Sequence, residues 1–149
     1  MTDSQRRQRI LALTPWERLA EHWERLGIRP GYRCVRGPEV GMAMVRGRMG
    51  GTGRAFNLGE MTLTRASVQL TDEVVPDAPL GHGWVKGRHA RHAELIALVD
   101  ACAQRGDWAV AIDEGLVAPL DAALAVERDA HGRQAAATRV DFFTLVRGE

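Results

Sequence analysis

An alternation of apolar and polar residues between positions 61 and 71 constrains the fold of this chain most strongly. The two alternating sets are Ala66, Val68 and Leu70 on one side and Arg65, Ser67 and Gln69 on the other. Successive side chains of a strand point to opposite faces of a sheet, so this strand has one dry face and one wet face. A sheet with one dry face needs a second layer packed against that face.

More strands are expected on both sides of this one. The sequence predicts them at 32–35, 40–49, 54–58 and 82–88. Gly50 to Gly53 forms one turn between them, and Gly59-Glu60 forms another. Residues 72–79 contain two prolines and three acidic residues, which is typical of a surface loop. Short strands joined by tight turns favour an antiparallel meander.

Two helices are expected before the sheet. The first starts near Ser4, and the second runs from Pro15 to Leu26 and stops at Gly27. Thr14 suits the N-cap of the second helix, and Glu17 suits the reciprocal position of a capping box. Apolar residues recur along the second helix at helical spacing and predict one buried stripe.

Helix returns after the sheet. One helix is expected from His89 to about Arg105, and a second helical stretch covers 108–128, where Pro119 must interrupt it or start a new helix. Residues 139–147 (RVDFFTLVR) predict a closing strand. The fold class is therefore α+β: N-terminal helices, a central antiparallel β-sheet, C-terminal helices and a closing strand.

The length fits a single domain. With 149 residues, the chain can bury one core of ordinary size. We expect residues 1–149 to form one domain, divided into a helical segment at 1–30, a β-rich segment at 31–88, a helical segment at 89–138 and the strand at 139–147.

Charge and hydropathy narrow the classes of function. Lys and Arg together number 20 against 19 Asp and Glu, and a nucleic-acid binder would be clearly basic. No apolar run suits a signal peptide or approaches the roughly 18 residues of a membrane span. We expect a cytoplasmic protein with reduced thiols and neither a nucleic-acid nor a membrane partner.

The glycine-rich segment from Arg48 to Arg54 is the most conspicuous local feature. Gly50, Gly51 and Gly53 would let backbone N–H groups converge on one anion, Thr52 adds a hydroxyl, and the two arginines flank the turn. These residues are therefore the candidate phosphate site. The segment lacks the Gly-Lys-Ser/Thr ending of a Walker A loop and the strand-to-helix context of a dinucleotide fingerprint. The alternative is a glycine-rich hairpin that only reverses the chain.

Other arginines raise the possibility of a cationic stripe. Arg46 and Arg48 share a face of their strand, and Arg65 and Arg88 could align with them to hold a polyphosphate or an acidic partner. The alternative is a solvated sheet face with scattered charge.

Outside the glycine-rich turn, the histidines and cysteines do not form a complete metal site or catalytic site. His89 and His92, with Glu94 nearby, have a spacing that can face one metal ion, but no further ligands complete the set. Surface histidines are the favoured interpretation, and no metal is predicted. Cys102 is expected in the core. Cys34 lies beside two arginines that would lower its pKa if it were exposed, although packing is favoured for it. The catalytic residues are unknown.

Several segments, in this order along the chain, resemble the PhnG subunit of the bacterial carbon–phosphorus lyase system. They are RMGGTG at 48–53, Phe56 and Gly59, LTRASVQLTD at 63–72, GWVKGR at 83–88, His92-Ala93-Glu94, APLD at 118–121 and RVDFFTLVRG at 139–148.

The resemblance implies a function within an assembly. PhnG-like chains work with PhnH, PhnI and the ATPase-like PhnL to displace adenine from ATP with methylphosphonate. The product is α-D-ribose 1-methylphosphonate 5-triphosphate, whose carbon–phosphorus bond PhnJ later cleaves. PhnG, PhnH, PhnI and PhnJ form a core assembly. ATP is then a co-substrate of the assembly, and no cofactor is expected on this chain itself.

Three hypotheses follow from the residues and the resemblance together. In the first, the chain is a scaffold only and docks through apolar surface that includes aromatic residues. In the second, it contributes a phosphate site through the glycine-rich turn. In the third, it is a free-standing nucleotide-binding protein. The aromatic residues expected at an interface are Trp16, Trp23, Trp84, Trp108, Phe142 and Phe143.

Overall fold

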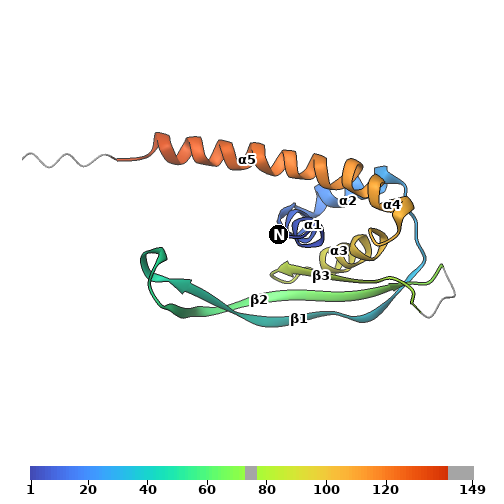
Figure 1. Cartoon of the computed structure of the whole chain (residues 1–149). Coiled ribbons are helices and arrows are strands. Elements are labelled where there is room, and N and C mark those ends of the chain that lie inside the picture. The colour runs from blue at the N-terminus through green and yellow to red at the C-terminus, as the bar shows by residue number, and fades with distance from the viewer. Residues whose placement is uncertain (73–76, 141–149) are drawn as a thin grey trace, which may run out of the picture.

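The computed structural model describes residues 1–72 and 77–140. In these residues, two helices precede the sheet, three strands form it, and three helices follow it (Figure 1). In chain order they are α1 (Asp3–Leu13), α2 (Trp16–Leu26), β1 (Tyr32–Arg48), β2 (Ala55–Leu70), β3 (Leu80–Lys86), α3 (Ala90–Cys102), α4 (Gly106–Ile112) and α5 (Ala118–Ala137). The α+β class is confirmed. Arg139 and Val140 are not in a strand, and the rest of the expected closing strand lies outside the described residues.

The sheet is antiparallel with the order β1-β2-β3. β1 pairs with β2 along its whole length, from Tyr32 opposite Leu70 to Arg48 opposite Ala55. The predicted division into shorter strands is wrong: 32–35 and 40–49 belong to one bulged strand, and 54–58 and 61–71 to another. Gly59-Glu60 is not a turn, because both residues pair with β1.

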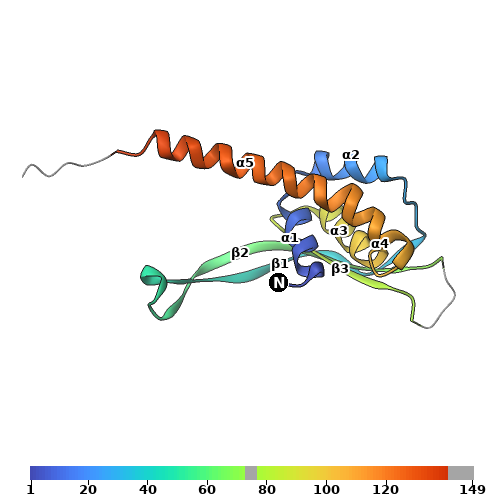
Figure 2. The ribbon, with the colours of Figure 1, turned by 45° about the horizontal axis from the view of Figure 1, so that its top comes forward.

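The β-hairpin is much longer than the third strand that accompanies it. β3 pairs with β2 only from Leu63 to Gln69. All the helices lie over one face of the sheet, with α3 directly on β2 and β3 (Figures 1 and 2). The far end of the β1–β2 hairpin therefore extends beyond both the third strand and the helices.

The core forms where α3 lies against the sheet. Ala66, Val68 and Leu70, the set that alternates in the sequence, are all buried. Gly81 and Gly83 of β3 lie beneath α3, and a Cβ atom at either position would collide with the carbonyl oxygens of Ala97 and Ala93. Glycine therefore allows the helix backbone to approach the strand closely.

The N-terminal helices begin and end with local signals. A capping box forms at the start of α1, where Thr2 and Gln5 exchange hydrogen bonds. The capping box predicted for α2 is wrong: Thr14 is buried and its hydroxyl donates to the carbonyl of Ile10, while Pro15 occupies the N-cap without a side-chain bond. Gly27 ends α2 in the left-handed conformation, as expected.

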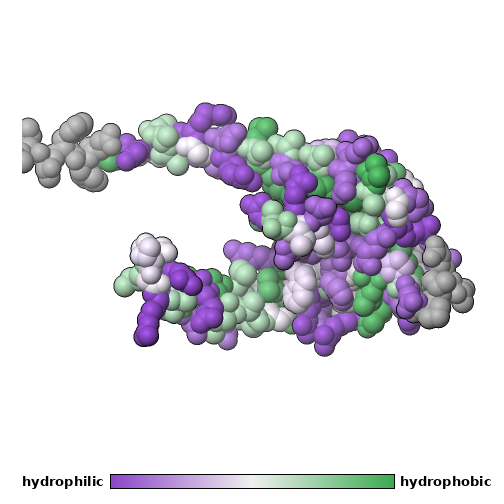
Figure 3. All heavy atoms as spheres, in the orientation of Figure 1, coloured by the Kyte–Doolittle hydropathy of each residue, from purple (hydrophilic) through white to green (hydrophobic). Residues whose placement is uncertain are grey.

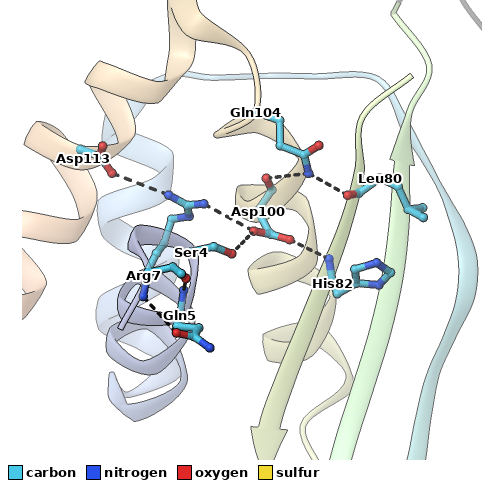
Figure 4. A network of polar contacts seen from close by, with 9 residues as sticks. Ser4, Gln5, Arg7, Leu80, His82, Asp100, Gln104 and Asp113 are labelled. Carbon is cyan, nitrogen blue, oxygen red and sulfur yellow. Dashed lines mark hydrogen bonds and ion pairs between the residues drawn. The ribbon is translucent and has the colours of Figure 1, made fainter. Parts of the chain in front are cut away.

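Asp100 of α3 joins three elements (Figure 4). Its Oδ1 accepts from the hydroxyl of Ser4 at 3.3 Å and from Nη2 of Arg7 at 3.5 Å, both on α1. Its Oδ2 accepts from the backbone N–H of His82 on β3 at 3.0 Å. The carboxylate therefore fixes α1 and the edge of the sheet to α3.

A short π-helical segment, Asp113–Val117, connects α4 to α5. Pro119 lies in the first turn of α5, so the proline begins the new helix, as one of the two sequence alternatives expected. Ile112, Leu116 and Leu120 are fully buried and hold this junction on the core. None of the helices in the described part of the chain is long and apolar enough to cross a membrane.

Two elements project from the helical body in the same general direction. They are the end of the β1–β2 hairpin and the C-terminal part of α5, and the space between them is open (Figure 3).

Candidate functional site

The candidate phosphate residues lie together at the tip of the hairpin. Pairing closes at Arg48 opposite Ala55, and a single 3-10 turn over Met49–Gly51 follows. Gly50 and Gly51 have φ angles of 62° and 76°, the left-handed region that favours glycine. The backbone N–H of Gly53 donates to the carbonyl of Met49 at 3.0 Å and closes the turn.

The charges at the tip face solvent. Arg48, Thr52 and Arg54 are exposed, as is Arg46 nearby on β1. Within residues 1–72 and 77–140, the side chains of these three arginines make no hydrogen bond or ion pair. The tip is a protruding end and not a cavity (Figure 3). An anion could approach its arginines and backbone from one side, and a second molecule would have to supply the other side.

The cationic stripe is wrong. Arg65 lies opposite Glu39 on the outer face of the sheet, where its Nε donates to the Glu39 carboxylate and its guanidinium lies 5.9 Å from the centre of the Trp84 ring. Arg46 and Arg48 continue the alternation that places Val40 opposite the buried Thr64, so they are on the opposite face. Arg88 lies in the turn after β3.

The histidine pair is divided between surface and core. His89 is exposed, but His92 is only 6% exposed, so the surface interpretation is wrong for His92. Nε2 of His92 donates to the carbonyl oxygen of Leu11 at 2.8 Å. Burial lowers the pKa of His92, and the nearby His89 also lowers it, against the raising effect of the bond to Leu11. Among the described residues, no group of three His, Cys, Asp or Glu side chains is placed to hold a metal.

His89 and His92 border a hollow of about 620 Å³ between the α1–α2 junction and the start of α3. Trp16, Lys86 and Arg91 also line it. The ring centre of Trp16 lies 6.0 Å from that of His92. The hollow is a surface groove beside the core.

The two cysteines differ in their surroundings. Cys102 is fully buried, as expected. Cys34 is exposed, so the expectation that it packs inside is wrong. Its thiol and the Tyr32 hydroxyl both donate to Oε1 of Glu94, at 3.4 and 3.0 Å. Partial burial and the Glu94 carboxylate raise the pKa of Cys34 and raise that of Tyr32 to about 12. Arg33 and Arg36 therefore do not make Cys34 an activated nucleophile.

A search of protein families and curated proteins identifies relatives of this chain. The family described as phosphonate metabolism protein PhnG matches residues 2–148. The chain is also 41% identical over 148 residues to the alpha-D-ribose 1-methylphosphonate 5-triphosphate synthase subunit PhnG of Rhizobium meliloti (strain 1021). That alignment covers 98% of this chain and 91% of the relative. The chain belongs to the PhnG family.

Most tryptophans of this PhnG-family chain do not form an exposed surface. Trp23 is in the core, and Trp16 and Trp108 are partly buried against it. The Arg105 guanidinium covers the Trp108 ring at 4.0 Å. Only Trp84 among the four is exposed, at 45%. The expectation of an aromatic interface is therefore wrong for Trp23, and for Trp16, Trp84 and Trp108 it stays a prediction. Phe142 and Phe143 lie outside the described residues.

The sequence analysis missed the apolar surface of the long hairpin. Val40, Met42 and Met44 on β1 and Phe56 and Leu58 on β2 are all exposed. The alternation of these residues on both sides of the glycine turn indicates two paired strands with an apolar face. The expected turn at Gly59-Glu60 hides this alternation, because it divides β2 into two short strands.

Proposed function

We propose that this chain is a subunit of the synthase that transfers ribose 5-triphosphate from ATP to methylphosphonate and releases adenine. Its partners are then PhnH-, PhnI-, PhnJ- and PhnL-type proteins, and ATP is the co-substrate of the assembly. The observation that carries the proposal is the 41% identity, over nearly the whole chain, to a curated subunit of that synthase.

The chemistry of the described side chains supports a role as a partner and not as a catalyst on its own. The thiol of Cys34 is engaged by Glu94 and has a raised pKa. His92 is buried and donates to a backbone carbonyl. Neither group is available as a general base or a nucleophile in the arrangements that acyl or glycosyl transfer requires.

Co-expression tests the subunit role. The chain would be produced with the PhnH-, PhnI-, PhnJ- and PhnL-type proteins of the same genome, followed by size-exclusion chromatography with light scattering. Adenine release from ATP in the presence of methylphosphonate would be measured with and without this chain. One stable species, with adenine release that depends on the chain, is the expected result. A monomer that ignores these proteins and binds ATP by itself would instead support a free-standing nucleotide-binding protein.

We propose a second role at the hairpin tip, where Arg48, Gly50, Gly51, Thr52, Gly53 and Arg54 contact the triphosphate or the phosphonate inside the assembly. The supporting observation is the clustering of exposed arginines around two left-handed glycines. Guanidinium groups and backbone N–H donors both suit phosphate oxygens.

The double variant Arg48→Ala/Arg54→Ala tests this role. A hydrogen bond to a charged group contributes about 1.5–3 kcal/mol, so we expect adenine release to fall at least tenfold while the assembly remains intact. Arg9→Ala, which removes an exposed arginine from α1, is the control and should behave like the wild type. If the double variant no longer assembles, the tip contacts protein. If it assembles and retains full activity, the phosphate role is wrong.

A further inference from the structure

The distal arm, defined here as residues 40–62, lacks the cover that the rest of the sheet has. β3 begins to pair with β2 at Leu63, and α3 lies over the part of β2 that follows Thr64. None of the arm residues is buried. The arm is therefore a two-stranded ribbon that extends from the protein by itself. Nine residues of β1 at about 3.4 Å each make it about 30 Å long.

Both faces of the distal arm carry apolar side chains. Val40, Met42 and Met44, which are 47%, 61% and 51% exposed, alternate along the inner face that continues from the core. Gly47 lies on the outer face, and a Cβ atom there would contact the side chain of Leu58. Leu58 is 62% exposed and its neighbour Phe56 is 41% exposed.

Such a ribbon does not satisfy the usual requirements of a sheet in water. Antiparallel sheets commonly leave one polar face to solvent and bury the other, and an isolated hairpin is only marginally stable. Within the described residues, both edges of the arm are also open, because no strand pairs with the outer side of β1 and β3 does not reach this part of β2. Open edges can accept a strand from another chain. Cover on both faces requires a cleft around the arm.

The charge of the arm identifies the kind of molecule that can form this cleft. Residues 40–62 contain three arginines, Arg46, Arg48 and Arg54, and one acidic residue, Glu60. A second copy of the chain would bring two cationic arms together and is disfavoured. Arg46 follows Met44 on the same face, so burial of Val40, Met42 and Met44 also desolvates Arg46. A desolvated guanidinium requires an acidic partner.

We propose that the distal arm inserts into a cleft of another protein subunit of the assembly, with apolar walls around Val40, Met42 and Met44 and a carboxylate opposite Arg46. The inference rests on the proposed function, because it places the partner in the synthase. It goes beyond that function by assigning the surface, the mode of contact and the chemistry of the partner. The arm residues number close to the roughly 20–30 that one side of a standard interface uses.

Binding measurements with the full chain test the proposal. The remaining subunits of the same genome would be purified together, and the affinity of the wild type for them compared with Met42→Ser/Met44→Ser and with Arg46→Glu. The matched controls are Val110→Ser, at an equally exposed valine of α4, and Arg9→Glu on α1. All four variants change exposed residues, so their thermal midpoints should stay within about 2 °C of the wild type.

We expect both arm variants to bind at least tenfold more weakly and both controls to bind like the wild type. The arm amides should also become protected from hydrogen exchange when the partner is added. If the wild type binds the other subunits but the arm variants bind equally well, the arm proposal is wrong and the subunit role stands. If the wild type binds none of them, the proposed function itself fails. If the free chain instead dimerises through the arm, and Met42→Ser/Met44→Ser abolishes this, the occupant is a second copy and the proposal is overturned.

Discussion

His92 of α3 faces α1, and its imidazole donates to the carbonyl oxygen of Leu11. Burial is the largest of the effects that lower its pKa below the ordinary value of 6.5. In the unfolded chain the imidazole therefore takes up a proton at a higher pH than in the folded chain. The stability that neutral His92 contributes is complete above about pH 6.5 and is lost as the pH falls toward the folded pKa.

The variant His92→Gln removes this dependence. An amide N–H can still donate to Leu11, but it does not titrate, so the free energy of unfolding should decrease less between about pH 7.5 and pH 5.5 than it does in the wild type. Urea unfolding at the two pH values measures this difference. His131→Gln, at an exposed histidine of α5, is the control and should keep the wild-type dependence. Equal pH dependence in all three proteins would show that His92 is not the titrating group.

Glycine at position 83 sets the distance between β3 and α3. A methyl group there would collide with the carbonyl oxygen of Ala93. Gly83→Ala should therefore reduce the free energy of unfolding by about 3 kcal/mol or more, since backbone and not a flexible side chain must move. The control is Gly132→Ala in α5, where a Cβ atom meets nothing within 4 Å. That variant should gain up to about 1 kcal/mol from helix propensity. Urea unfolding of both variants checks the prediction, and a stable Gly83→Ala protein would contradict the packing.

At the scale of elements, the distal arm is separable from the core. Gly41 and Leu63 face each other across the hairpin. An armless variant that replaces residues 42–62 with Asn-Gly would close the ladder with a two-residue turn. No buried residue is lost, so we expect the free energy of unfolding to change by less than about 1 kcal/mol. The same variant should fail to join the assembly. Loss of folding would show that the arm stabilises the core.

The sequence predicted the elements whose signals are local. The alternation of Ala66, Val68 and Leu70 gave the face of β2 that packs on α3, and Gly27 gave the end of α2. The length of the hairpin depends on pairing between residues far apart in the chain. Gly59 pairs with Val45, and nothing in the local sequence distinguishes this paired glycine from one in a turn.

The sequence predicted where the candidate site lies in the chain, but it did not predict which of the candidate side chains are exposed and which are buried. The glycine turn with Arg48 and Arg54 was located correctly, because turn residues act locally. Exposure was predicted poorly. Cys34 is exposed because β1 is an edge strand at the margin of α3, although Glu94 of that helix still reaches its thiol. His92 is buried because α1 lies against α3. Both outcomes depend on how the helices are placed over the sheet.

At the scale of the whole molecule, two projections leave an open form (Figures 1 and 3). α5 contains 20 residues, which makes it about 30 Å long, similar to the distal arm. A compact chain of this length would have a radius of gyration of about 15 Å. Small-angle scattering of the free chain should give a clearly larger value, and the armless variant a smaller value than the wild type. A radius near that of a compact sphere would show that the projections fold back in solution.

The π-helical segment at Asp113–Val117 joins α4 to α5 without changing the face that buries Ile112 and Leu120. Each residue of an α-helix turns it by about 100°, and a π-turn accommodates one residue more than regular α-helical bonding would. Loss of a single residue between Asp113 and Val117 would therefore restore regular bonding and leave Leu120 on the buried side of α5. Loss of a residue later in α5 has no such turn to absorb it and would rotate the remainder of the helix by about 100° around its axis. A change of length is tolerated in this one turn and not in the helix that follows it.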